Sequence, residues 1–364
     1  MTEVLRKHPL ALSIKHFFDF LIFTEPVWAL PILIFTYIFL FLGLYDYVYP
    51  GLIISTFPLF LNYLRYGKLS QPTAFDVPVF LFLISALVAV VISNQPALSF
   101  GAFTSCVLMT LFYYSVVNYP HTKSWPFWIL IYLVLVPVFA LVITRVFWQP
   151  FTSFMADLGA VVNLSVHKPA ESSFSLILFI VALPLLGLVI REKNILFRLT
   201  LVFATFGLTA ASYLIKQDAL LRVITGVSLK NRLTVWEKAL SLVREKPLTG
   251  VGFGHLPGLH NAYLELYTNT GILGVLAAFI AIIISVRLMW DILCSKYKPL
   301  WTGFGLGLFF VVVYVALLAV LESSPFGFFV QMEYSYYYVV SPIPWLIASL
   351  LVVTHRMLTQ KPSP

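Results

Sequence analysis

The sequence predicts an all-α, polytopic membrane protein with about ten transmembrane helices. Charged residues make up only 10% of the chain, far below the roughly 25% of a soluble domain. The mean hydropathy is +0.93, and apolar runs long enough to cross a bilayer recur along the whole length. These runs are continuous rather than alternating, which disfavours a barrel. We therefore expect residues 1–364 to form a single integral membrane domain.

Turn-forming residues separate the apolar runs, as at Tyr49-Pro50-Gly51 and Asn94-Gln95-Pro96. No internal repeat of the kind that marks many transporters is visible. In order, the candidate spans lie near residues 27–45, 50–64, 76–93, 97–118, 126–146, 172–190, 198–215, 261–286, 300–321 and 337–353.

Lys and Arg residues predict the orientation, because short cytoplasmic loops of membrane proteins carry an excess of them. With both termini in the cytoplasm, the inner segments hold 14 of the 23 Lys and Arg residues. These are Arg6, Lys7, Lys15, Arg65, Lys68, Lys123, Arg191, Lys193, Arg198, Arg287, Lys296, Lys298, Arg356 and Lys361. The loop between the seventh and eighth spans then lies outside.

That outer loop, residues 216–260, is unusually basic. It carries Lys216, Arg222, Lys230, Arg232, Lys238, Arg244 and Lys246. One interpretation is that a long loop is translocated regardless of its charge. The other is an anion site on the outer face, which Arg145 and Lys168 of the preceding outer loop would join.

Within this loop, residues 231–246 are predicted to form an amphipathic helix that ends before Pro247. Ser228 or Asn231 is the expected cap, and Thr234 with Glu237 has capping-box spacing. One face carries Arg232, Trp236, Ala239, Val243 and Lys246. Residue types alone favour a helix that lies on the outer membrane surface, with Trp236 as an anchor and Arg232 reaching the headgroups.

Three glycines at alternate positions, Gly250, Gly252 and Gly254, follow the helix. They indicate a tight turn or a close approach of two backbones. Alternatively, free backbone amides there would form a nest for phosphate oxygens.

Next come His260 and Asn261 at the outer mouth of the eighth span, and then Tyr263 and Glu265. A carboxylate one turn into an apolar span is costly, so Glu265 is either a functional residue or half of a structural ion pair.

The order Arg232-x-x-x-Trp-x-x-Ala, Pro-Leu-x-Gly-x-Gly-x-Gly, His260-Asn-x-Tyr-Leu and Gly271-x-x-Gly resembles the signature region of the O-antigen ligase and O-antigen polymerase family. The resemblance covers residues 232–274. It implies a GT-C-like glycosyltransferase that moves a glycan from undecaprenyl diphosphate to an acceptor at the outer face of the bacterial inner membrane. The acceptor is lipid A-core in ligases and another carrier-linked glycan in polymerases.

By the same resemblance, the signature Arg of the family falls on Arg232, its essential His on His260, and an upstream Arg on Arg145. Arg232 would hold the diphosphate with help from Arg145, Lys216 and Arg222, because a guanidinium forms a bidentate fork with phosphate. His260 would deprotonate the acceptor hydroxyl or bind the diphosphate.

The remaining candidate binding residues are Trp236, Asn261, Tyr263 and Glu265; the two aromatic rings could stack on sugars. The outer loops contain no Asp-x-Asp pair or His cluster, so we expect neither a metal nor another cofactor. The expected partners are membrane lipids and carrier-linked glycans, and no nucleic acid. Two other classes stay open: a transporter or flippase for a lipid-linked sugar or an anion, and a non-catalytic member of a polysaccharide assembly complex.

Overall fold

A computed structural model of the chain describes just under half of its residues. These are residues 16–17, 20, 48–67, 70–118, 227–253, 259, 261–294, 305–309, 311–313, 316, 330–331, 338–339 and 342–359. They are helical apart from turns and one short β pairing, so the predicted helical class is confirmed for this part of the chain.

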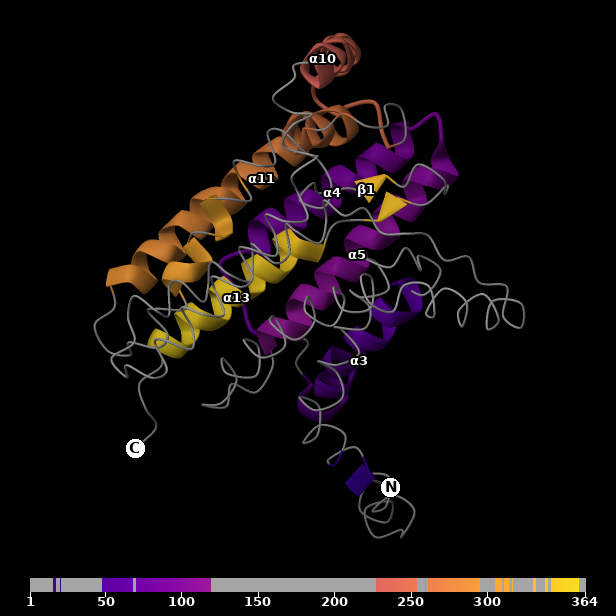
Figure 1. The fold of residues 1–364 in the computed structure, drawn as a ribbon. Helices are drawn as coiled ribbons and strands as arrows, with labels where there is room; N and C mark the ends of the chain where they lie inside the picture. The colour runs from indigo at the N-terminus through magenta and orange to yellow at the C-terminus, as the bar shows by residue number, and fades with distance from the viewer. Residues whose placement is uncertain are drawn as a thin grey trace, which may run out of the picture.

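Four helices run alongside one another, as Figure 1 shows: α4 (Asp76–Ile92), α5 (Pro96–Asn118), α11 (Ala262–Cys294) and α13 (Pro342–Thr359). Within this bundle α11 packs on α4 and α13, and α5 packs on α4 and α13. Two further helices join it from outside: α3 (Val48–Tyr66) against α5, and α10 (Val227–Glu245) against α11. In Figure 1, α10 lies at one end of the bundle, next to the start of α11.

Five of these helices fall on predicted spans, the second, third, fourth, eighth and tenth. Of the ninth span, residues 305–309, 311–313 and 316 are described and helical. The spans near 27–45, 126–146, 172–190 and 198–215 lie outside the described residues. Among the residues described, α5 and α11 are long and apolar enough to cross a membrane. The total of ten spans stays a prediction.

One small departure from the all-α prediction precedes α13. Strands β1 (Val330–Gln331) and β2 (Tyr338–Val339) pair antiparallel, and β2 lies against α5. The tenth span was predicted to start at residue 337, but α13 starts at Pro342. A proline is tolerated in the first turn of a helix, where its missing N–H has no partner to lose.

Many large apolar side chains of α4 and α11 are exposed, while their buried positions combine small residues with larger ones such as Phe82 and Met289. The exposed residues recur every three or four positions: Val77, Phe80, Ile84, Leu87 and Val91 on α4, and Leu276, Phe279, Ile283, Val286 and Trp290 on α11. The buried positions of the same helices include Ala86, Ala89, Gly274, Ala277 and Ala278. A helix in a water-soluble protein turns its large apolar side chains inward. Small residues at the helix contacts are typical of packing within lipid.

Candidate functional site

The site region is built on α10, which packs against α11 through the face that the sequence predicted. On this face Ala239 is 0% exposed and Val243 is 2% exposed. Glu237 and Lys238 on the other side are exposed. Protein therefore covers Ala239 and Val243, so these two positions do not rest on lipid headgroups as the sequence had suggested, whereas Arg232 and Trp236 are partly exposed and Lys246 is exposed.

The start of α10 also differs from the prediction, because the helix begins at Val227 instead of residue 231. All four residues proposed for capping lie inside the helix: Ser228, Asn231, Thr234 and Glu237. Leu229 and Lys230 are good helix formers and extend the helix at this end. The other end agrees with the prediction, since α10 stops at Glu245, before Pro247.

Trp236 links α10 to the segment that leads into α11. Its indole Nε1 donates a hydrogen bond to the backbone carbonyl of Leu259, at 2.7 Å. Leu259 itself is 2% exposed. A tryptophan that anchors a helix at a membrane interface directs its N–H toward water and headgroups. The N–H of Trp236 is instead bound within the protein, while the side chain is only partly buried. The role of Trp236 as a membrane anchor stays a prediction.

The glycine turn makes the close backbone approach that the sequence predicted. Gly250 and Gly252 have φ values of 71° and 85°, a conformation that favours glycine. A Cβ on Gly250 would lie 2.5 Å from the carbonyl oxygen of Thr268 in α11, and one on Gly252 would lie 2.7 Å from Cβ of Ser93, just beyond α4. Gly254 lies outside the described residues.

The backbone amides of this turn are already engaged. The amide of Gly250 donates to Lys246 O at 2.9 Å, that of Val251 to Thr268 O at 2.8 Å, and that of Gly252 to Asn269 O at 3.2 Å. A phosphate nest needs amides that point together at a free anion. The alternative interpretation of residues 250–252 as a nest is therefore wrong.

The same hydrogen bonds stabilise a break in α11. Gly271 has φ 64° and ψ −161°, which interrupts the helix. In an unbroken helix Thr268 O would accept from the amide of Ile272; here it accepts from Val251, and the amide of Ile272 donates to Pro247 O at 3.1 Å. Residues 247–252, which we call the glycine strap, thus supply the partners that the broken helix lacks. The sequence analysis had treated residues 261–286 as one continuous span.

The candidate residues at the start of α11 have defined places. Asn261 caps the helix, because its Oδ1 accepts from the amide of Leu264 at 2.9 Å. The Tyr263 hydroxyl donates to the carbonyl of Ala316 at 3.1 Å. Glu265 is 6% exposed, and the next turn adds the buried polar residues Thr268, Asn269 and Thr270. The helix start is thus polar inside, as the sequence indicated for Glu265.

Arg232 is partly exposed and lies one helical turn before Trp236 on α10. Residues four apart on a helix have Cβ atoms about 5–6 Å apart. The structure therefore brings Arg232 close to the position where Trp236 holds Leu259, the residue before His260. His260 itself, with Arg145, Lys216 and Arg222, lies outside the described residues. Within the described residues no three His, Cys, Asp or Glu side chains are grouped so as to hold a metal ion.

A polar network at the opposite end of the bundle was missed by the sequence analysis. Asp76, the first residue of α4, accepts two hydrogen bonds from Thr73: Oδ2 accepts from the Thr73 amide at 3.0 Å, and Oδ1 accepts from the Thr73 hydroxyl at 2.6 Å. Tyr114 of α5 also donates to Asp76, at 2.9 Å. The Thr-x-x-Asp spacing is a signal that could have revealed this start of α4.

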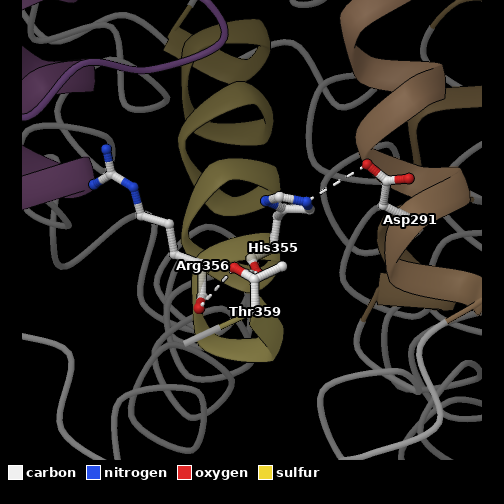
Figure 2. Close-up of polar contacts among 4 residues, drawn as sticks. All are labelled: Asp291, His355, Arg356 and Thr359. Atoms are coloured by element: carbon white, nitrogen blue, oxygen red, sulfur yellow. Dashed lines mark hydrogen bonds and ion pairs between the residues drawn. The ribbon is translucent and has the colours of Figure 1, made fainter. Parts of the chain in front are cut away.

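Arg356 and His355 tie α13 to its neighbours at this same end. Arg356 Nη1 donates to Val117 O of α5 at 3.0 Å, and Nη2 donates to Pro72 O at 3.0 Å. His355 Nε2 lies 3.5 Å from Asp291 Oδ2 of α11. Figure 2 shows the two side chains pointing to opposite sides of α13. These contacts hold the bundle together rather than forming a ligand site.

An apolar cavity of about 160 Å³ lies between α4, α11 and α13, and Val312 and Ala316 also line it. Phe82, Tyr263, Ala278, Ser285 and Trp345 are among the residues that line it. Tyr263 therefore borders the interior of the bundle, whereas the sequence analysis had proposed it for sugar stacking. No sequence periodicity indicates such a cavity, because it depends on how three helices pack.

Comparisons with known proteins do not assign the chain to a family. No protein-family model matches the sequence, and no curated protein matches it either. The functional assignment therefore depends on the residues themselves and on the way the fold arranges them.

Proposed function

We propose that the protein is a glycosyltransferase of the membrane, similar to the O-antigen ligases. It moves a glycan from undecaprenyl diphosphate to an acceptor at the outer face of a bacterial inner membrane. In this proposal the chain crosses the membrane about ten times, both termini are cytoplasmic, and the loop 216–260 faces the periplasm. The polymerase reaction, in which the acceptor is another carrier-linked glycan, uses the same residues.

The observation that carries the proposal is the contact between α10 and the start of α11. The Trp236–Leu259 hydrogen bond brings the helix that carries Arg232 to the segment that contains His260. These are the two residues with the clearest chemistry for the reaction, and 28 positions of sequence separate them. The exposed apolar stripes of α4 and α11 support the membrane location.

The chemistry divides between a cation and a base. The acceptor hydroxyl attacks the anomeric carbon, the bond from that carbon to the diphosphate oxygen breaks, and His260 takes the hydroxyl proton. Negative charge grows on the leaving diphosphate, where the Arg232 fork stabilises it together with Arg145, Lys216 and Arg222. A single displacement inverts the anomeric centre.

Transfer by the purified protein tests the proposal directly. The protein in detergent or nanodiscs is given a carrier-linked glycan and either lipid A-core or a second carrier-linked glycan, in excess EDTA. We expect product with one acceptor, and no loss of rate in EDTA, since the outer loops lack a carboxylate cluster. Activity that EDTA abolishes and Mg²⁺ or Mn²⁺ restores would contradict the metal-independent mechanism. If neither acceptor gives product, the proposed glycosyltransferase function is wrong.

A transporter or flippase is the second candidate, because α11 is broken at Gly271 beside buried polar residues. Broken helices in transporters bind ions and substrates with the backbone groups that the break frees. In α11 the freed carbonyls of Thr268 and Asn269 already accept from amides of the glycine strap. This observation favours a structural break over a transport site. Uptake of a labelled carrier-linked sugar into proteoliposomes, without any glycosyl transfer, would reverse the preference.

A further inference from the structure

Leu259 and Asn261, on either side of residue 260, each take part in a hydrogen bond between a side chain and the backbone. On one side the Trp236 indole binds the carbonyl of Leu259, and the Leu259 side chain is buried. On the other side Asn261 caps α11 through its own side chain. The first bond comes from a different helix, α10, so it ties two elements that are distant in the sequence.

We infer that Trp236 is a positioning residue: its N–H orients the segment that carries His260 instead of donating to the sugar. The inference rests on the proposed function for the role of His260. The indole N–H already donates to Leu259 O at 2.7 Å, so it is not available to donate to a sugar hydroxyl. The buried neighbours Ala239 and Val243 fix the rest of the helix face against α11.

The inference predicts a particular pattern of kinetics. A general base displaced by about 1 Å can lose on the order of 10²-fold in rate, while binding of the donor elsewhere changes little. Trp236→Phe keeps an aromatic ring and removes only the N–H donor. We expect its turnover to fall about 10-fold or more with little change in KM for the donor. A sugar-stacking residue would instead change KM.

Trp345→Phe is the matched control. Trp345 is also buried, at 7% exposed, but its Nε1 has no hydrogen-bond partner. Removal of that N–H therefore breaks no bond, and we expect turnover near that of the wild type. The comparison separates loss of the hydrogen bond from loss of an indole in general.

A double-mutant cycle with His260→Ala tests whether Trp236 acts through His260. If it does, Trp236→Phe causes no further loss of turnover in a protein that already carries His260→Ala. An equal loss in both backgrounds, or wild-type turnover in Trp236→Phe, would overturn the inference.

Hydrogen exchange supplies a readout that does not depend on activity. Amides of residues 259–264 should exchange faster in Trp236→Phe than in the wild type or in Trp345→Phe. If the amide exchange rates of residues 259–264 are the same in Trp236→Phe and the wild type, the positioning role is overturned, whatever the function of the protein. If the wild type has no transfer activity, only the glycosyltransferase proposal is overturned. If Trp236→Phe does not fold, benzothienylalanine at position 236 keeps the size of the indole without its N–H and takes its place.

Discussion

At the scale of single residues, two arginines of α10 have different surroundings although they lie on the same helix. Arg232 lies on the face that packs toward α11 and is partly exposed, whereas Arg244 is exposed on the solvent side of the same helix. Both residues carry the same charge and belong to the loop 216–260, which is predicted to lie outside. A role in binding diphosphate should therefore distinguish them, and a general electrostatic role should not.

We predict that Arg232→Lys is severely impaired in transfer, by about 10²-fold, the scale seen when one preorganised donor is removed from a site of developing charge. Lysine keeps the charge but cannot form the planar fork with phosphate. Arg244→Lys on the same helix is the control and should keep its turnover. Steady-state kinetics of the two variants test this prediction. Near-normal turnover in Arg232→Lys would mean that Arg232 contributes only its positive charge and forms no specific bond to the diphosphate.

For His260→Ala we expect normal expression and an unchanged melting temperature in detergent, with transfer reduced by about 10²-fold or more, the scale of a lost acid–base group. His355→Ala, at the other end of the bundle beside Asp291, is the control and should transfer normally. Donor affinity is measured in parallel: it stays constant if His260 serves the acceptor hydroxyl and falls if His260 binds the diphosphate. Wild-type turnover would exclude His260 from the mechanism.

At the scale of elements, the glycine strap and the break in α11 depend on each other. Each supplies hydrogen bonds that the other lacks, and the two backbones approach too closely for a side chain at Gly250 or Gly271. Non-helical backbone within a membrane is tolerated only where protein satisfies its polar groups. The strap thus connects the end of α10 to the interior of α11 and also touches the Ser93 end of α4.

Gly271→Ala should therefore destabilise the protein. Its backbone conformation is nearly exclusive to glycine and costs other residues about 1–3 kcal/mol, and a Cβ there would overlap Leu248 O and the Gly250 amide. Gly101→Ala in α5 is the matched control, since a Cβ at Gly101 has nothing within 4 Å. Melting in detergent should show a loss of several degrees for Gly271→Ala and little change for Gly101→Ala. Equal melting temperatures would mean that the strap contributes little to stability.

At the scale of the whole molecule, the described helices gather the predicted outer ends at one end of the bundle and the predicted inner ends at the other. Gly252 and Phe253 of the predicted outer loop contact the predicted outer ends of the third and fourth spans: Gly252 lies against Ser93, and Ser99 donates to Phe253 O at 3.5 Å. Arg356 binds the carbonyl of Pro72, in a predicted inner loop, and that of Val117, at the predicted inner end of the fourth span. The alternation of the spans is thus consistent with the packing, although packing alone does not say which end faces the cytoplasm.

Cysteine labelling can decide the orientation. In a variant with Cys106 and Cys294 replaced, a cysteine at Ser228 should react with an impermeant reagent added from outside, and one at Asn194 should react only after the membrane is opened. The physical reason is the excess of Lys and Arg in the predicted inner loops. Labelling of position 194 alone from outside would invert the topology and place Arg232 on the wrong side for a periplasmic reaction.

The sequence by itself determined the helical class, the packing face of α10 and the need for glycine at positions 250 and 252. Each of these follows from local chemistry: apolar content, a repeat of 3.6 residues, and freedom of φ. The predicted face was right at Ala239 and Val243, even though the helix began earlier than its supposed caps and Lys246 lies beyond its end. Capping residues compete with good helix formers upstream, so a pattern of caps places a helix end poorly.

Only the tertiary structure decided what covers that face, where α11 breaks, and which residues meet. Periodicity shows that a helix face is apolar, but either lipid or protein can cover such a face. The role of Trp236 therefore became clear only from its hydrogen bond to Leu259. The break at Gly271 is stable because a segment about twenty residues earlier supplies the missing partners. Such partners come from packing between distant segments, which no local pattern records.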